Sequence, residues 1–313
     1  MKAARIDRYG GPEVIKVVPN ADRPAVQPGQ LLVEVWAASL NPVDTALRSG
    51  QMKQMMPLEF PATLGGDFAG VVAEVGSGVT GFSVDDDVYG QANALLGGSG
   101  SLAELVAAQS GMTAPKPKSV DFVTAASLPL VGGSAVQAIL DHLDVQKGQR
   151  ILIHGAAGGV GSIALQIAKH LGAYVIATAL THQLEFVEQL GADEIVNTSR
   201  QAFETAVRDV DCALDTVGGD VAAKSYGVIK RGGTLVSMTA QPDESRMRET
   251  GVKAIGQFTQ PTTERLTKLA QLVDDGVVKP YVGRIFPLEQ SVEAFRFRED
   301  RKNEGKVIVT VQA

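Results

Sequence analysis

The sequence predicts an α/β protein that combines a doubly wound parallel sheet with a second, β-rich domain. Between residues 150 and 238, short apolar runs alternate with segments of helical spacing, which is the pattern of strand–helix–strand crossovers. Residues 1 to about 120 lack this alternation and contain short strand-like runs between glycines, as a twisted β-domain does. The length of 313 residues is too great for one ordinary core and suits two domains.

The β-rich domain is predicted from both ends of the chain. Its N-terminal strand-like runs are residues 30–37, 68–76, 85–90 and 101–106. The C-terminal run 306–311 is also strand-like, but the helical segment before it offers no partner, so we expect this strand to return to the N-terminal domain. We therefore assign residues 1–122 and 266–313 to the β-rich domain and residues 123–265 to the parallel-sheet domain.

Within the parallel-sheet domain, strands and helices alternate five times. The predicted strands are residues 150–154, 173–178, 194–196, 211–215 and 234–238. In the first helix, Ile163, Ile167 and Leu171 recur at four-residue spacing and form one apolar face. A further run, 252–258, is predicted to be the last strand of the sheet, with one charge and no proline. Its free edge is either covered by a loop or paired with a second copy, and we expect a homodimer joined there.

A glycine-rich turn connects the first strand of this domain to the first helix. The segment Ala156-Ala-Gly158-Gly-Val-Gly161 fits the pattern G-x-G-x-x-G with alanine in place of the first glycine. At such a turn, free backbone N–H groups and the positive end of the helix bind phosphate, and small residues let a pyrophosphate approach. The sequence therefore predicts a Rossmann-type dinucleotide site.

The choice of dinucleotide depends on the end of the second strand. An NAD site usually has Asp or Glu there to bind the ribose 2′-hydroxyl, but no acid appears before Glu185. The missing carboxylate permits a 2′-phosphate, which Thr178, Thr181 and His182 could bind. An equally good interpretation of His182 is that it lies at the surface and binds no phosphate. We expect NADPH as the cofactor, with NADH the less favoured alternative.

Composition excludes several other classes of protein. The net charge of −6 gives no general attraction to nucleic acid or to anionic lipid. The N-terminus lacks the apolar core of a signal peptide, and no run approaches the roughly 20 apolar residues that span a bilayer. Cys212 is the only cysteine, which excludes an intrachain disulfide and a cysteine-rich zinc site. We expect a cytoplasmic protein with no membrane or nucleic-acid partner.

Six motifs, in order, resemble a known family. They are NPVD (41–44), GGDFAGVVAEVGSGV (65–79), LPLVGGSAVQAI (128–139), ILIHGAAGGVG (151–161), LGADEIV (190–196) and EGKVIV (304–309). Together they resemble the zinc-independent quinone oxidoreductase branch of the medium-chain dehydrogenase/reductase superfamily. The resemblance covers nearly the whole chain. It implies a GroES-like N-terminal domain, a Rossmann domain, and NADPH in a cleft between the two.

The resemblance also implies which residues bind the cofactor. Ser134 and Phe258 belong to the nicotinamide end, residues 215–218 to the ribose side, and the glycine turn to the pyrophosphate. The whole implied set is Ser134, Ala156, Ala157, Gly158, Gly159, Val160, Gly161, Asn197, Thr216, Val217, Phe258, Asn303 and Lys306. This sequence departs from the family at Leu180, where relatives often have a polar residue, and at Asn197-Thr198, where a tyrosine is common. Both departures weaken the NADP assignment without reversing it.

The zinc ligands of related enzymes have no counterpart here. Zinc-dependent relatives have a cysteine before the NPVD region and a GHE motif, where this chain has Gly65-Gly66-Asp67, so we expect no metal. Asp67 is expected to bond the backbone, and Asp44 either does likewise or has a direct chemical role. Asn41 resembles the pocket asparagine of the family and is the best donor to the substrate, and Arg48 could stabilise negative charge. His154 and Cys212 are expected to be structural.

Three functions remain open. The first is an NADPH-dependent oxidoreductase that transfers hydride to quinones or related electron-poor acceptors without zinc. The second is an NADPH-dependent reductase of α,β-unsaturated carbonyls, which uses the same hydride geometry. The third is a nucleotide-binding protein with little turnover. In the first two cases the substrate is a small, apolar carbonyl compound or quinone.

Overall fold

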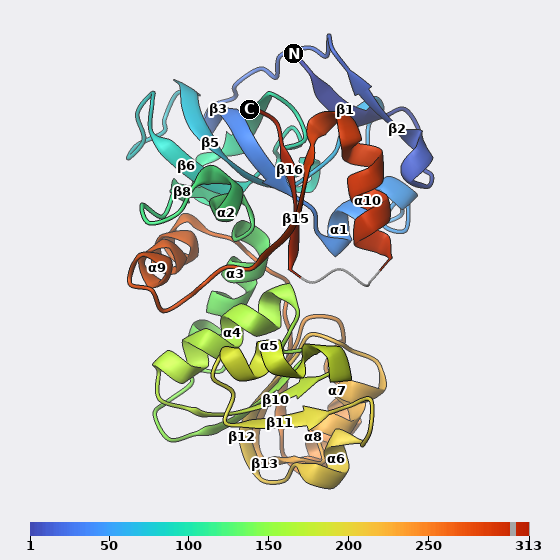
Figure 1. Ribbon diagram of the computed structural model, residues 1–313, viewed down its shortest axis with the longest axis vertical. Coiled ribbons are helices and arrows are strands. Elements are labelled where there is room, and N and C mark those ends of the chain that lie inside the picture. Colours follow the sequence, from blue (N-terminus) through green and yellow to red (C-terminus); the bar gives the residue numbers. More distant parts are fainter. Residues whose placement is uncertain (301–304, 313) are drawn as a thin grey trace. The chain divides into compact units, whose positions relative to one another are not determined.

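The computed structural model describes residues 1–300 and 305–312, which form two compact units (Figure 1). The first unit consists of Met1–Leu130, Pro261–Asp275 and the described residues from Pro280 onward. The second consists of Val131–Gln260 and Gly276–Lys279. Helix α3, Pro129–Val136, begins in the first unit and ends in the second. No helix in the described ranges is long and apolar enough to cross a bilayer.

A six-stranded parallel sheet forms the centre of the second unit. The strand order is β11-β10-β9-β12-β13-β14, so the chain adds strands first on one side of β9 and then, from β12 onward, on the other side. The strands are β9 (Arg150–His154), β10 (Tyr174–Ala179), β11 (Glu194–Asn197), β12 (Val210–Asp215), β13 (Ile229–Ser237) and β14 (Lys253–Gly256). This order confirms the doubly wound sheet. In such sheets ligands bind outside the carboxyl ends of the strands, at the point of reversal.

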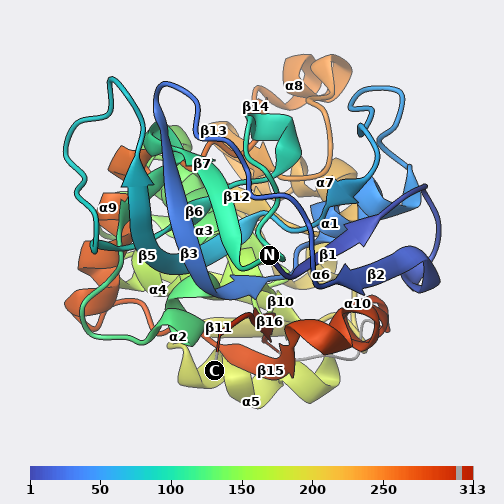
Figure 2. The same ribbon diagram turned by 90° about the horizontal axis from the view of Figure 1, so that it is seen from above.

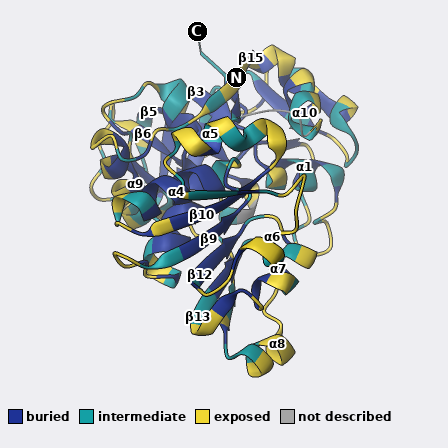
Figure 3. Cartoon of the chain, turned by 60° about the horizontal axis from the view of Figure 1, so that its bottom comes forward, coloured by how far each residue is buried: buried dark blue, intermediate teal, exposed yellow. Residues whose placement is uncertain are grey.

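Helices cover both faces of this sheet, and its central strands are buried (Figure 3). The helices are α4 (Gly159–His170), α5 (Leu184–Gln189), α6 (Phe203–Ala206), α7 (Asp220–Ser225) and α8 (Glu244–Thr250), and a π-helical turn covers Gln137–His142. Leu152, Ile176 and Leu235 from three strands share one core cluster with Phe203 of α6. Helix α7 ends at Ser225, and Gly227 lies in the hydrogen-bonded turn that leads into β13.

The first unit contains two β-sheets. The larger has the order β15-β16-β3-β5-β6-β8, with β7 also paired to β3, and the smaller has the order β2-β1-β4. The strands are β1 (Ala3–Ile6), β2 (Ile15–Val18), β3 (Gln30–Ser39), β4 (Ala62–Thr63), β5 (Asp67–Val75), β6 (Asp87–Gln91), β7 (Leu105–Gln109), β8 (Thr113–Pro115), β15 (Val282–Pro287) and β16 (Lys306–Thr310). Val309 of β16 pairs with Ala38 of β3, which confirms the return of the C-terminal strand.

Four α-helices complete the described part of the first unit. They are α1 (Pro42–Ser49), α2 (Phe122–Ala126), α9 (Thr263–Asp274) and α10 (Ser291–Glu299). Helix α10 lies beside β1 and β2 (Figure 2), and its Phe295 shares a core cluster with Ile6 and Ile15. Helix α9 is part of this unit through the hydrogen bond from the Tyr89 hydroxyl to the Leu266 carbonyl, 2.6 Å long.

Candidate active site

The glycine turn in the second unit links β9 to α4. Gly155 has a φ of +66°, which favours glycine, and its carbonyl accepts a 2.9 Å hydrogen bond from the N–H of Gly158. A Cβ at Gly161 would lie 2.4 Å from the Gly155 oxygen, so only glycine lets the helix pack this closely on the turn. A Cβ at Gly158 would meet only the same oxygen, at 3.2 Å. Gly161 is therefore needed for packing. Gly158 leaves an open space in front of the turn, which we call the cradle.

The start of α4 presents backbone N–H groups to this cradle. In the described part of the chain, the N–H groups of Gly159, Val160 and Gly161 donate no backbone hydrogen bond, as is usual in the first turn of a helix. Gly158 is exposed, while Ala156 is fully buried beneath the turn. This site suits a dinucleotide pyrophosphate for three reasons. The helix end is positive, its first N–H groups are free to donate, and the position of Gly158 would be filled by any side chain.

The carboxyl end of β10 lies beside this turn. The side chain of Thr178 is buried, and its hydroxyl is 3.2 Å from the N–H of Gly155 and 3.3 Å from Nδ1 of His154. The hydroxyl is therefore held within the protein. Leu180, the first residue after β10, is apolar and 45% exposed.

A small polar cluster covers the ends of β10 and β11. The amide of Asn197 donates to Oγ1 of Thr181 at 3.1 Å, and the N–H of Thr181 donates to Oγ of Ser199 at 3.2 Å. His182 is exposed beside this cluster, and Arg200 follows Ser199. Sequence reasoning missed Ser199, although its place two residues after Asn197 on the loop beyond the third strand was a usable signal.

The turn after β12 is fixed by a buried carboxylate. Asp215 accepts from the N–H groups of Val217 and Gly218, both at 2.9 Å, and from the Ser237 hydroxyl at 2.8 Å. Thr216 donates to the carbonyl of His154 at 2.9 Å, which ties this turn to the end of β9. These bonds leave the side chain of Val217 54% exposed.

The segment after β14 carries a second exposed apolar side chain. Phe258 is 62% exposed, and its carbonyl accepts from the Gln137 amide at 3.2 Å. The neighbouring Thr259 forms a 2.6 Å hydroxyl–hydroxyl contact with the buried Ser134. The second unit thus brings Ser134 into contact with the segment that carries Phe258.

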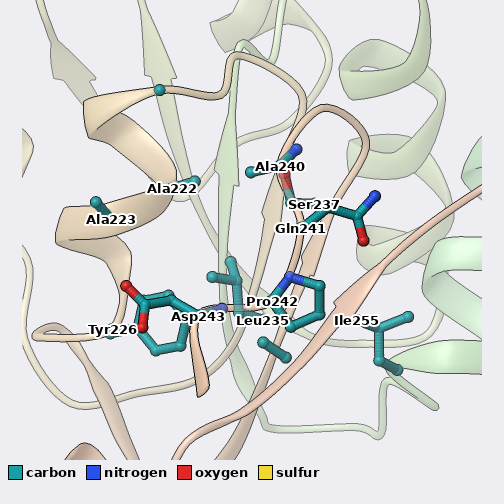
Figure 4. Close-up of a pocket in the computed structure, with 12 residues that line it drawn as sticks. Ala222, Ala223, Tyr226, Leu235, Ser237, Ala240, Gln241, Pro242, Asp243 and Ile255 are labelled. Atoms are coloured by element: carbon teal, nitrogen blue, oxygen red, sulfur yellow. Dashed lines mark hydrogen bonds between the residues drawn. The ribbon is translucent and has the colours of Figure 1, made fainter. Parts of the chain in front are cut away.

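The second unit also contains a pocket of about 150 Å³ between α7, β13 and β14 (Figure 4). Its lining is mainly apolar, with Tyr226, Leu235 and Ile255, and Asp243 is its one charged side chain. A phosphate would find no positive partner there. The glycine turn is therefore the better candidate for the dinucleotide.

A buried polar cluster lies in the first unit, around Asp67. The Lys306 ammonium lies 2.6 Å from Oδ1 of Asn41 and 3.5 Å from Oδ2 of Asp67, and the Asn41 amide donates to the same Oδ2 at 2.7 Å. Burial lowers the pKa of Lys306, and the nearby carboxylates of Asp67 and Asp44 oppose that effect. Asn41 is only 1% exposed, and its amide is used inside this cluster.

The other partners of Asp67 are mostly side chains. Its carboxylate accepts from the Ser39 hydroxyl at 2.8 Å, from the Gln91 amide, and from the backbone N–H of Leu130 at 2.9 Å. The expectation of backbone contacts was therefore correct for one bond only. Ser39 and Gln91 escape sequence reasoning because they lie on strands whose pairing with β5 cannot be read from spacing.

Helix α1 supplies the remaining predicted residues of this unit. Asp44 accepts from the backbone N–H of Asn41, as expected of a capping residue. Arg48 is buried, with Nη1 3.0 Å from Oε1 of Glu299 and its guanidinium 5.4 Å from the Phe295 ring centre. Asn41, Asp44 and Lys306 are thus brought together. Asn303, the remaining predicted residue, lies outside the described residues.

The residues expected to be structural are buried. Cys212 lies in β12, and burial raises the pKa of its thiol. His154 at the end of β9 is also buried. Among the described residues, no group of three or more His, Cys, Asp and Glu is placed to hold a metal ion.

Comparisons with known proteins agree with this layout. The alcohol dehydrogenase GroES-like domain family matches residues 27–118, and the zinc-binding dehydrogenase family matches residues 190–309. The chain is 37% identical, over 99% of its length, to the chloroplastic NADPH-dependent alkenal/one oxidoreductase of Arabidopsis thaliana, of which it covers 79%.

Two solved structures are similar over almost the entire chain. The quinone oxidoreductase from Coxiella burnetii is 34% identical, with a TM-score of 0.88 and coverage of 100% of this chain and 99% of that one. A mycobacterial protein solved in complex with NADPH is 28% identical, with a TM-score of 0.86 and coverage of 99% of this chain and 100% of that one.

Proposed function

The chain belongs to the quinone oxidoreductase-like branch of the medium-chain dehydrogenase/reductase superfamily and is an NAD(P)H-dependent oxidoreductase; within that class, we propose that it uses NADPH to reduce quinones. The observation that carries the proposal is the open glycine cradle at the start of α4. It offers the free N–H groups of Gly159, Val160 and Gly161 to a pyrophosphate.

The preference for NADPH is supported at the end of β10. Leu180 puts an apolar side chain where a carboxylate would repel a 2′-phosphate. The hydroxyl groups of Thr181 and Ser199 and the Asn197 amide form an exposed cluster from which a phosphate could accept hydrogen bonds. In the part of the chain that the structure describes, no lysine or arginine side chain bonds to this cluster, so the preference rests on the missing acid and on neutral donors.

The proposed reaction needs little chemistry from the protein. NADPH supplies a hydride, which is two electrons and one proton, and solvent supplies the second proton that turns the quinone into a hydroquinone. The glycine turn holds the pyrophosphate, and the exposed side chains of Val217 and Phe258 provide apolar surface for the nicotinamide ring and a flat acceptor. In the first unit, a buried cluster holds the turn into α1 in place. It consists of Asn41, Asp67 and Lys306, which bind one another.

A second candidate is the reduction of α,β-unsaturated carbonyls. The observation that favours it is the 37% identity to the Arabidopsis NADPH-dependent alkenal/one oxidoreductase. In that reaction the hydride adds to the β-carbon and a proton from solvent adds to the α-carbon. The same cofactor cradle would serve both reactions, so the acceptor decides between them.

A comparison of acceptors tests the proposal. NADPH oxidation is followed with 1,4-benzoquinone and with 3-buten-2-one, after NADPH binding has been established by fluorescence titration. A higher kcat/KM for the quinone supports the proposal, and a higher value for the enone supports the second candidate. NADPH binding with no oxidation by either acceptor would instead indicate a nucleotide-binding protein with little turnover.

We further propose that zinc takes no part. Gly66 stands in the GHE position of zinc-dependent relatives, and its Cβ position faces Gln91 and not a ligand set. Activity should survive exhaustive EDTA treatment followed by gel filtration. Activity that is lost on chelation and restored by zinc alone would contradict this part of the proposal.

A further inference from the structure

A chain of hydrogen bonds runs beneath the glycine turn. The N–H of Gly155 donates to the Thr178 hydroxyl at 3.2 Å, and that hydroxyl lies 3.3 Å from Nδ1 of His154. On the other side of the ring, Nε2 of His154 lies 3.0 Å from Oγ of Ser225, and the Ser225 hydroxyl donates to the Val221 carbonyl at 2.7 Å. The chain therefore connects the turn to α7.

One arrangement of protons satisfies every donor and acceptor of this chain. The Ser225 proton points to the Val221 carbonyl, so Oγ of Ser225 accepts from Nε2–H of His154. Nδ1 then has a lone pair, which accepts the hydroxyl proton of Thr178. The oxygen of Thr178 is left to accept from the N–H of Gly155. The neutral Nε2–H tautomer satisfies every member.

The surroundings keep the imidazole of His154 in this state. Its ring packs edge-on against Phe203, with ring centres 4.4 Å apart, and the side chains of Thr178 and Ser225 are also buried. Burial lowers the pKa of His154 to about 4, although the charges of Asp215 and Glu204 oppose that effect. Glu204 has its own partner, Lys224, at 2.7 Å.

The backbone of His154 joins a second turn to the first. Its carbonyl accepts from Oγ1 of Thr216, in the turn that carries the exposed Val217. The Gly155 Cβ position would lie 2.6 Å from the same Oγ1, so the two turns are in direct contact. One buried residue therefore fixes both turns at the carboxyl edge of β9 and β12.

We propose that His154 and Thr178 are positioning residues for cofactor binding: the imidazole orients the Thr178 hydroxyl, and that hydroxyl holds the N–H of Gly155 so that the glycine turn keeps the shape that receives the pyrophosphate. The inference rests on the proposed use of NADPH. In this proposal Thr178 acts on the cofactor indirectly, by holding the glycine turn, and does not contact the 2′-phosphate.

Two substitutions at Thr178 separate the hydroxyl from the shape of the side chain. Thr178→Val keeps the branched shape and removes the hydroxyl, which leaves the N–H of Gly155 without its acceptor. Thr178→Ser keeps the hydroxyl. We expect the Kd for NADPH, measured by fluorescence titration, to rise about tenfold in Thr178→Val and to stay within about twofold in Thr178→Ser.

A double-mutant cycle tests whether the two residues act together. His154→Leu should weaken NADPH binding about as much as Thr178→Val, and the double variant should be no worse than either single variant. Full additivity, or equal affinity of Thr178→Val and wild type, would overturn the proposal. Circular dichroism and thermal melting establish that each variant is folded.

Nitrogen NMR of histidine-labelled protein tests the inference without any cofactor. His154, assigned by its absence in His154→Gln, should be the neutral Nε2–H tautomer from pH 5 to pH 8. A protonated ring or the Nδ1–H tautomer would refute the hydrogen-bond chain even if a variant fails to fold. A wild-type protein that shows this tautomer but binds no NADPH would refute the proposed function and leave the chain itself intact.

Discussion

Asp44 and Asn41 form an asymmetric pair at the start of α1. Oδ2 of Asp44 accepts from the N–H of Asn41 at 2.7 Å, whereas its Oδ1 is buried and, in the described ranges of the chain, has no hydrogen-bond partner. Burial raises the pKa of this carboxyl to about 7, with a further contribution from the charge of Asp67. A buried carboxyl with one unused oxygen favours the protonated form.

Asp44 should therefore make stability depend on pH. Its pKa in the folded protein, about 7, is above the ordinary value of 3.8, so its contribution is fully present below pH 3.8 and is lost as the pH rises through 7. Asp44→Asn imitates the protonated form at every pH. Relative to wild type, the variant should gain about 1.4 kcal/mol in unfolding free energy for each pH unit between 4 and 7.

Urea unfolding of both proteins across this range measures the difference. Groups that do not interact with Asp44 titrate equally in the two proteins, so their contributions cancel. A difference between Asp44→Asn and wild type that stays constant from pH 4 to pH 7 would show that Asp44 is ionised throughout.

The two glycines of the turn should respond differently to substitution. Gly158→Val puts a side chain into the open cradle, so NADPH binding should weaken at least about tenfold while the fold is retained. Gly161→Val puts a Cβ 2.4 Å from the Gly155 oxygen and should destabilise the second unit. Fluorescence titration and thermal melting distinguish the two effects. Unchanged NADPH affinity in a folded Gly158→Val variant would place the pyrophosphate elsewhere.

Cofactor preference should change at Leu180. Leu180→Asp places a carboxylate at the end of β10, where it would repel a 2′-phosphate and could accept from a ribose 2′-hydroxyl. We expect the ratio of NADPH to NADH affinity to fall about tenfold. Leu180→Asn is the matched control, since it has the same shape without the charge. If both variants bind the two cofactors like wild type, the adenosine ribose does not lie beside Leu180.

We propose a homodimer that forms through the free edge of β14. Gln257 donates its N–H to the Ser237 carbonyl of β13, and since N–H groups alternate along a strand, Ile255 also faces β13 while Ala254 faces the open edge. Ala254→Pro should therefore weaken the dimer and spare the sheet, whereas Ile255→Pro should damage the sheet itself. Sedimentation of wild type and of both variants measures how tightly each dimer forms. A wild-type monomer at micromolar concentration would contradict the proposal, and so would an Ala254→Pro dimer as tight as wild type.

Sequence alone was a good guide to the parallel sheet and a poorer one to the polar clusters. The apolar runs and the glycine turn predict β9 and α4, because both signals depend only on residues that are close together in the sequence. The chain from Gly155 through Thr178 to Ser225 could not be predicted, because its members lie 23 and 71 residues from their partners and meet only when strands pair. For the same reason, Asn41 was expected to face substrate, and its bonds to Asp67 and Lys306 were not foreseen.

The position of β16 has a consequence for how the protein is made. This strand, Lys306–Thr310, lies between β15 and β3, so the larger sheet of the first unit is incomplete until residues 306–310 have been synthesised. The strands of the second unit, by contrast, all lie between residues 150 and 256. On the ribosome the middle of the chain can therefore close its sheet first. The larger sheet of the first unit is completed later, once residues 306–310 are available.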